Sequence, residues 1–243
     1  MRFLHSQATH IGRRDNNEDQ LLLRPTQGLY AVADGMGGYE GGEVASRLAL
    51  ETLDGYVERA NGAMVLDAVD GGLMRGQLEL AIRMADRAVR RAAQGGLSRM
   101  GTTLAMLVVQ DDRALVAHVG DSRVYRLRDR ELEPLTRDHS LSAELEAAGF
   151  QGPTVGRSST PFGHVVTQAL GQGRSIQPDF RLVSVRPGDA FLVCSDGLTD
   201  VLADDDLEAM LGEDEVTAGS LVRLAFELGG HDNITAILLR VVS

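Results

Sequence analysis

Carboxylate side chains recur in this sequence at one kind of position, which is the end of a short apolar run or the loop beside it. The members of this set are Glu18, Asp19, Asp34, Asp121, Asp196 and Asp232. Acids are rarely buried without partners, so an acid that adjoins both a strand and a glycine is either a turn residue or a ligand. A turn explains any single Asp-Gly pair well, but it is a weak explanation for the whole set.

If the ends of these strands converge in the fold, the carboxylates repel one another, and bound divalent cations would relieve that repulsion. Sites made of oxygen ligands alone select hard ions, which here means Mg²⁺, Mn²⁺ or Ca²⁺. The sequence has no cluster of cysteine and histidine that would indicate structural zinc. The acids therefore predict a site for hard divalent cations.

Several other chemistries are excluded by the residues that the chain lacks. It has no lysine, which rules out a Walker-type phosphate loop, the protein-kinase fold and Schiff-base catalysis. Cys194 is the single cysteine, and a cysteine-dependent phosphatase would need an arginine at position 200, where this chain has Asp200. Ser122 and Ser195 lack the Gly-x-Ser-x-Gly turn of serine hydrolases.

The elements that must position the acids come in blocks rather than in strict alternation. Apolar runs predict strands over 21–23, 29–33, 103–109, 114–119, 124–127, 132–135, 180–185, 190–194 and 234–242. Helical spacing predicts helices over 45–56, 78–92, 141–148 and 221–228, and Asp205 with Glu208 resembles a helix start. Such blocks favour antiparallel sheets flanked by helices. The strand content also argues against a helical metal-dependent hydrolase, which the pair His231-Asp232 alone would suggest.

Short motifs occur in a fixed order along nearly the whole chain. They are Arg14-Asp15-Asn16-Asn17-Glu18-Asp19, Asp34-Gly35-Met36-Gly37-Gly38, Gly101-Thr102-Thr103, Gly120-Asp121-Ser122-Arg123, Ser195-Asp196-Gly197-Leu198-Thr199-Asp200 and Asp232-Asn233. Each motif is weak alone. The ordered set resembles the bacterial type 2C protein phosphatases, a family of serine/threonine phosphatases that depend on magnesium or manganese.

The resemblance implies an α+β fold, a four-layer α-β-β-α sandwich in which two packed antiparallel sheets are flanked by helices. No linker or repeat divides the chain, so we expect residues 1–243 to form one catalytic domain. The family also carries a flap beside its active site, which would fall at about 140–165 here. The stretch 151–163 is rich in glycine, serine, threonine and proline, as expected of such a loop.

The resemblance further implies two central metal ions and their ligands. Asp34 would bridge both ions, aided by the carbonyl of Gly35. Glu18 would serve one ion, whereas Asp196 and Asp232 would serve the other. Two cations about 3.5–4 Å apart lower the pKa of a shared water, and the resulting hydroxide would attack phosphorus directly.

Further residues take supporting roles by the same resemblance. Asp121 and Asp200 would hold a third, looser ion, so two or three Mn²⁺ or Mg²⁺ ions are expected in all. Asp19 and Asn233 would support the ligands from behind without touching an ion. Arg14 would clamp the substrate phosphate, because a guanidinium makes paired hydrogen bonds to phosphate oxygens. The expected reaction is hydrolysis of phosphoserine and phosphothreonine in proteins, opposing a bacterial serine/threonine kinase.

The sequence departs from the family at one position. Met36 stands where some members carry a histidine that protonates the leaving alkoxide. Either a metal-bound water or His139 would then take that role, although His139 can also be structural. Two alternative functions stay open: a catalytically silent domain that binds phosphoproteins, and a phosphatase for small phosphoesters.

The charge and the N-terminus bear on partners and location. The net charge is −11, with 35 acidic against 24 basic residues, so we expect the surface to repel nucleic acid and anionic membranes. Phosphorylated proteins are the expected partners, among them a kinase and its substrates. The N-terminus lacks the apolar stretch of a signal peptide, which predicts a cytoplasmic protein, and we expect a monomer.

Overall fold

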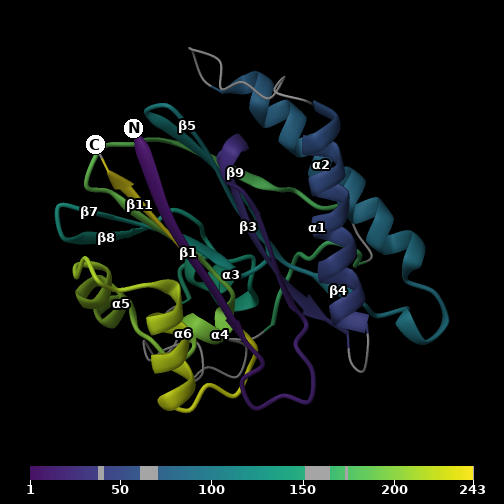
Figure 1. Ribbon diagram of the computed structural model, residues 1–243. Coiled ribbons are helices and arrows are strands. Elements are labelled where there is room, and N and C mark those ends of the chain that lie inside the picture. Colours follow the sequence, from purple (N-terminus) through teal and green to yellow (C-terminus); the bar gives the residue numbers. More distant parts are fainter. Residues whose placement is uncertain (38–40, 61–70, 151–164, 173–174, 243) are drawn as a thin grey trace.

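The strands form two antiparallel sheets that lie face to face (Figure 1). The structure is a computed structural model that describes residues 1–37, 41–60, 71–150, 165–172 and 175–242. The first sheet has five strands, in the order β1 (Arg2–His10), β11 (Ile234–Val242), β10 (Ala190–Cys194), β7 (Arg123–Arg128) and β8 (Glu131–Pro134). The second sheet has the order β2 (Asp19–Arg24), β3 (Leu29–Met36), β5 (Leu104–Gln110), β6 (Arg113–Val119) and β9 (Asp179–Ser184), and the short strand β4 (Gly101–Thr102) pairs with β3.

Helices cover the outer faces of both sheets. The second sheet is covered by α1 (Gly41–Ala60) and α2 (Gly72–Ala92), and the first by α4 (Asp196–Thr199), α5 (Asp204–Leu211) and α6 (Ala218–Glu227) (Figure 1). The remaining helical segments are α3 (Leu141–Ala147) and the short 3₁₀ turns at Pro25–Gln27 and Gly95–Leu97. None of the helices in the described chain has the length and hydropathy needed to span a membrane.

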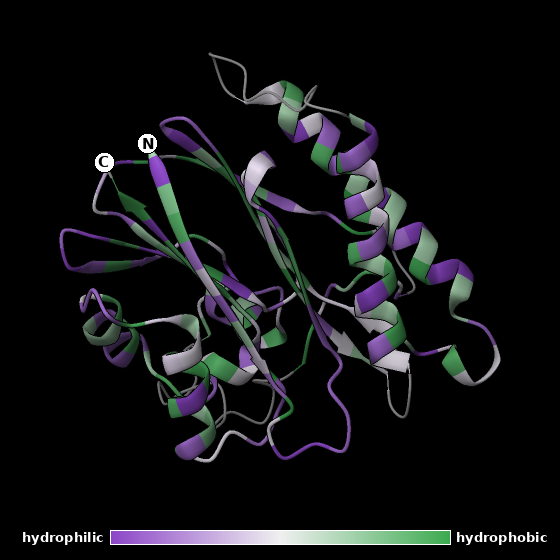
Figure 2. Cartoon of the chain, viewed as in Figure 1, coloured by the Kyte–Doolittle hydropathy of each residue, from purple (hydrophilic) through white to green (hydrophobic). Residues whose placement is uncertain are grey.

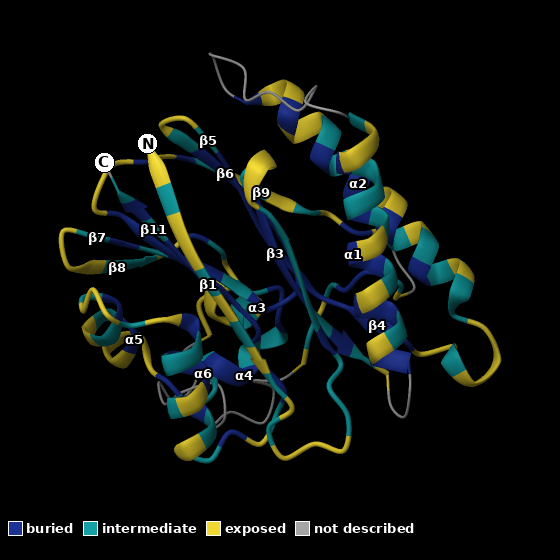
Figure 3. Cartoon of the chain, in the orientation of Figure 1, coloured by how far each residue is buried: buried dark blue, intermediate teal, exposed yellow. Residues whose placement is uncertain are grey.

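Side-chain alternation along the inner strands produces the layers. On β3, Ala31 and Ala33 face the helices α1 and α2, whereas Tyr30 and Val32 face the other sheet. The same alternation on β10 and β11 separates an intersheet core from a core beneath α4, α5 and α6. Because successive side chains of a strand point to opposite faces, strands buried on both faces read as continuous apolar runs. Figures 2 and 3 show these strands as hydrophobic and buried, while β1 at the edge is more polar and exposed.

The fold class predicted from the sequence is confirmed, since the four layers follow the expected order. The predicted strands 190–194 and 234–242 coincide with β10 and β11. The sequence prediction missed β1, whose half-exposed residues give no apolar run. It also missed α4, a single turn, and it ended β3 too early. The predicted loop 151–163 lies outside the described residues.

The predicted start of α5 needs a correction. The helix begins at Asp204, and the carboxylate that reaches back to its start is that of Asp206, which accepts a hydrogen bond from the backbone N–H of Ala203 at 3.2 Å. Asp205 and Glu208 do not take that role. Three consecutive aspartates fit the first turn equally well by sequence, so only the backbone geometry identifies the capping one.

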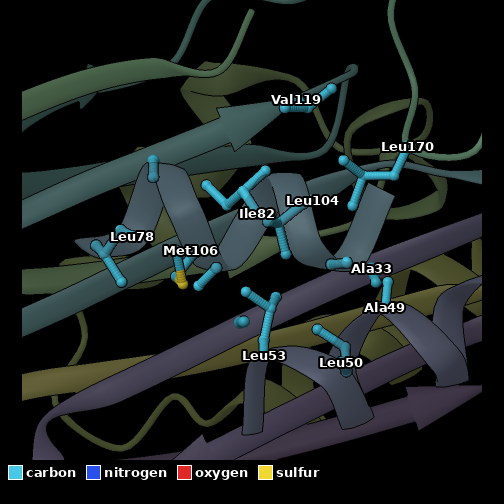
Figure 4. Close-up of a cluster of buried hydrophobic side chains, with 14 of the residues drawn as sticks. Ala33, Ala49, Leu50, Leu53, Leu78, Ile82, Leu104, Met106, Val119 and Leu170 are labelled. Carbon is cyan, nitrogen blue, oxygen red and sulfur yellow. The ribbon is translucent and has the colours of Figure 1, made fainter. Parts of the chain in front are cut away.

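The helix layer over the second sheet provides a test of the packing. Leu78 on α2 is fully buried with Leu53 and Met106, as Figure 4 shows, whereas Leu80 two residues later is 52% exposed. Leu78→Ala should lower the free energy of unfolding by about 2–5 kcal/mol, because it leaves a cavity that the core cannot fill. Leu80→Ala, the matched control, should change it by no more than about 0.5 kcal/mol. Urea unfolding followed by circular dichroism measures both, and equal effects would contradict this packing.

Candidate active site

A cavity of about 1180 Å³ lies where the ends of strands from both sheets meet. Its lining contains all of the residues predicted to bind metal or phosphate, namely Arg14, Glu18, Asp34, Gly35, Asp121, Asp196, Asp200 and Asp232. Asn233 lines it too, and Asp19 is 3% exposed in the strand beside it. The structure therefore brings together the residues that the sequence singled out, while their roles stay predictions.

Antiparallel pairing of β2 with β3 fixes the centre of the cavity. Asp19 stands opposite Asp34 in the strand register, and the N–H of Gly35 donates to the carbonyl of Glu18 at 3.2 Å. Thr103, between β4 and β5, holds Asp34: its N–H donates to the Asp34 carbonyl at 2.8 Å, and its Oγ1 accepts from the Asp34 N–H at 3.0 Å. The backbone around Asp34 is thus fixed on both sides.

The carboxylate of Glu18 lies against the start of α1. A Cβ atom added to Gly42 would stand 2.1 Å from Glu18 Oε2, so only glycine leaves room for this carboxylate. Ser46, one turn into the helix, donates its hydroxyl to the Glu18 carbonyl at 2.5 Å. The first turns of α1 therefore pack directly against Glu18.

Asn233 ties the loop that carries Arg14 and Glu18 to the start of β11. Its Oδ1 accepts from the N–H of Glu18 at 2.7 Å, and its Nδ2 donates to the carbonyls of Ile11 and Asn16 at 2.8 and 2.9 Å. Its own N–H donates to Oδ1 of Asp232 at 2.8 Å. Asn233 thus holds the backbone beside Glu18 and Asp232, and its supporting role stays a prediction.

Asp19 is buried behind the cavity rather than in its wall. Its Oδ2 accepts a hydrogen bond from the hydroxyl of Ser195 at 2.7 Å, and that hydroxyl accepts from the N–H of Thr235 at 3.0 Å. Ser195 precedes Asp196, so this contact connects β2 to the segment that carries Asp196. From the sequence, Ser195 is part of a motif and is excluded as the nucleophile of a serine hydrolase, so no supporting role is predicted for it.

Burial and neighbouring charges raise the pKa values of the acids in and beside the cavity. Burial raises the pKa of Asp34 well above its ordinary value, and the charges of Asp19 and Asp196 raise it further. Burial also raises the pKa of Asp19 to about 7, with the charges of Asp196 and Asp232 adding to the shift. The pKa of Glu18 is raised by burial, which Asn16 and Arg14 partly offset. Because their pKa values are raised, these carboxylates do not all lose their protons readily unless a positive charge binds among them.

The residues present fit the predicted divalent cations. Every candidate ligand offers oxygen, which matches the preference of Mg²⁺ and Mn²⁺. The cavity is open to solvent around Arg14, whose side chain is 58% exposed, so ions and a phosphate group can enter. The raised pKa values show that negative charge on Asp19 and Asp34 is unfavourable, and bound cations would neutralise it.

The structure also separates the two candidates for protonating the leaving group. Met36 lines the cavity, in place of the histidine of some family members. His139 does not line it, because both of its ring nitrogens lie against Gly120 and Asp179 instead. His139 is therefore a structural histidine here. The cavity lining also includes Glu43, which no sequence pattern singled out, and His231, which the sequence offered only in the rejected His231-Asp232 pair.

Comparison with known proteins agrees with the fold. The family model for protein phosphatase 2C matches residues 6–221. Protein phosphatase PhpP of Streptococcus pneumoniae is 35% identical over 243 residues, which cover 96% of each chain. The crystal structure of the serine/threonine phosphatase PstP of Mycobacterium tuberculosis has a TM-score of 0.86 and 32% identity, with 99% of both chains covered. A structure of the PstP catalytic domain with two manganese ions has a TM-score of 0.84 and 32% identity over 99% of both chains. This chain belongs to the protein phosphatase 2C family.

The raised pKa of Asp19 predicts how stability depends on pH in a metal-chelated sample. The folded state binds a proton up to about pH 7, whereas the unfolded carboxyl loses it near its ordinary pKa of 3.8. Stability should therefore fall as pH rises through this window. Asp19→Asn should make that fall shallower, since the amide does not titrate. Thermal unfolding in EDTA between pH 4 and 8 measures the difference, and parallel curves for the two proteins would contradict the assignment.

Proposed function

We propose that this chain hydrolyses phosphoserine and phosphothreonine in proteins and needs two or three Mn²⁺ or Mg²⁺ ions to do so. The observation that carries the proposal is the convergence of oxygen ligands from distant strands around Asp34 in one cavity, with an arginine at its opening. Membership of the protein phosphatase 2C family supports the same activity.

The acids would hold the cations in the arrangement that the resemblance implies. Asp34 and the Gly35 carbonyl lie in the cavity wall with Glu18 beside α1, while Asp196 begins α4 and Asp232 lies just before β11, next to the opposite sheet. When bound, the cations supply a nucleophile from water at neutral pH and neutralise the phosphate charge. The contribution of the chain is to fix these carboxylates in advance, so that no rearrangement opposes the reaction.

Asp121 and Asp200 would hold the third ion. Asp121 follows β6 and is 2% exposed, and Asp200 ends the single turn α4, where its N–H donates to the Asp196 carbonyl at 2.7 Å. That bond places Asp200 one turn after Asp196. Asp121, after β6, and Asp200, at the end of α4, would thus hold this ion.

Arg14 is placed to bind the substrate phosphate. Its Nη2 donates to Oδ2 of Asp232 at 2.7 Å, which orients the guanidinium at the edge of the cavity. A guanidinium has five N–H donors, so this contact leaves donors for phosphate oxygens. We propose that water protonates the leaving alkoxide, because Met36 cannot and His139 faces away from the cavity.

Several finer features belong to the same proposal. Residues 1–243 form one catalytic domain with a flap segment at about 140–165, of which residues 151–164 lie outside the described residues. The substrates include a bacterial serine/threonine kinase and proteins that it phosphorylates. The chain acts as a monomer in the cytoplasm. Each of these features follows from the sequence and the family resemblance stated above.

Removing a single ligand oxygen tests the metal-dependent chemistry. Asp34→Asn and Asp232→Asn should each reduce phosphate release from a phosphothreonine peptide at least about 100-fold in saturating Mn²⁺, because they weaken ion binding at the reacting centre. Asp112→Asn is the control, since this exposed acid lies in the turn between β5 and β6.

The same assay separates the alternative functions. Full activity of wild type in excess EDTA would contradict the metal-dependent mechanism. Peptide binding without hydrolysis would identify a silent binding domain. A kcat/KM for a small aryl phosphate far above that for the phosphopeptide would identify a small-molecule phosphatase.

The role of Arg14 predicts a change in substrate affinity. Arg14→Ala should raise KM for the phosphopeptide by about 10- to 100-fold while kcat is largely kept, because a hydrogen bond to a charged group is worth about 1.5–3 kcal/mol. Arg14→Lys keeps the positive charge but not the paired hydrogen bonds, so its KM should lie between those of wild type and Arg14→Ala. Steady-state kinetics in Mn²⁺ measures all three proteins. A fall in kcat at unchanged KM would overturn the assignment.

A further inference from the structure

The turn that carries Asp121 is held from one side by Thr103. Gly120 has a φ of +102°, and an added Cβ would stand 2.7 Å from Thr103 Cγ2, so the turn packs directly on this side chain. The hydroxyl of Ser122 lies 2.7 Å from Thr103 Oγ1, the same atom that accepts from the N–H of Asp34. One threonine therefore fixes the turn relative to Asp34.

His139 holds the same turn from the other side. Its backbone N–H donates to the carbonyl of Gly120 at 2.8 Å, and the N–H of Gly120 donates to Nδ1 of the imidazole at 3.2 Å. The two bonds close a ring between Gly120 and His139, which is 8% exposed. The carbonyl of His139 accepts from the N–H of Thr167 at 2.8 Å, next to Val166 in the cavity wall.

An ion pair braces this ring immediately beside it. Arg123 lies two residues after Asp121, and Asp138 precedes His139. The guanidinium donates to both carboxylate oxygens of Asp138 at 2.8 Å, and the two side chains are 21% and 10% exposed. A bidentate pair of this kind fixes the relative positions of the two segments more firmly than a single contact.

The position of the proton on the His139 imidazole distinguishes a structural link from a metal site. His118, His139 and Asp179 offer ligand atoms within 4.8 Å of one another, as a metal site would. Because Nδ1 of His139 accepts the Gly120 N–H, the proton of the neutral ring is on Nε2, which lies 3.4 Å from Asp179 Oδ2. An ion on Nε2 would need that proton to move to Nδ1, where it would face the Gly120 N–H. The hydrogen bonds therefore favour a structural link.

We propose that His139 is a positioning residue: through Gly120 it holds Asp121 in the place where this acid binds the third ion. The inference rests on the proposed function for the role of Asp121, and it adds a residue outside the cavity to the determinants of metal affinity. Residues that orient a metal ligand from behind change affinity by about 10- to 100-fold when they are replaced.

Two polar substitutions of His139 test the roles of its two ring nitrogens separately. In His139→Asn, the amide oxygen can stand where Nδ1 is and accept from Gly120, but nothing reaches Asp179. In His139→Gln, the longer amide reaches the position of Nε2 toward Asp179, and the acceptor for Gly120 is lost. Electron paramagnetic resonance of free Mn²⁺ measures binding to each full-length protein without reference to activity.

We expect wild type to bind a third, weaker Mn²⁺ ion. His139→Gln should weaken binding of this ion by about 10- to 100-fold and leave the affinities for the two tighter ions within about threefold of wild type. His139→Asn should keep all three ions within about threefold of wild type. Arg128→Gln is the control for general destabilisation, because Arg128 makes a comparable bidentate pair with Asp189 at the far end of β7. It should lower Tm without changing the third ion.

The outcomes separate this inference from the proposed function. Equal affinities for the third ion in wild type and His139→Gln would overturn the role of His139, and so would equal losses in both His139 variants. If wild type binds only two ions, the role of Asp121 is overturned and the two-ion reaction stands. If wild type binds none, the proposed function is overturned with it.

Discussion

Mutual repulsion among carboxylates at the ends of buried strands is the constraint on which this structure depends. Burial raises the pKa values of Asp34 and Asp19, and the charge of the neighbouring Asp196 raises both further. A fold that only had to be stable would separate them. Their proximity is favourable only where bound positive charge balances them, and hard divalent cations supply that charge.

The rest of the fold supplies the rigidity that such a site needs. Three apolar layers hold the two sheets and their helices together, and the acids lie at the strand ends, where these layers stop. Hydrogen bonds from Thr103, Asn233 and Ser195 then fix individual ligands or the residues beside them. The layers position the strand ends, and this polar shell positions the oxygen atoms.

The sequence predicted the fold well because its inner strands are buried on both faces and read as unbroken apolar runs. It singled out residues that line one cavity, because acids adjoin those runs in the order typical of one family, while the roles of these residues stay predictions. It missed β1 and α4, whose local patterns are weak. It could not exclude His139 as the proton donor, since the hydrogen bonds that turn its ring away from the cavity involve Gly120 and Asp179, which are distant in the sequence. Thr103 and Ser195 likewise act through contacts that no spacing rule predicts.

The most direct test of the central claim is anomalous diffraction at the manganese absorption edge, from crystals grown with excess Mn²⁺. The account predicts at least two anomalous peaks inside the cavity, both within coordination distance of Asp34, with Glu18 on one and Asp196 and Asp232 on the other. A cavity without peaks, or peaks bound only elsewhere on the molecule, would contradict it.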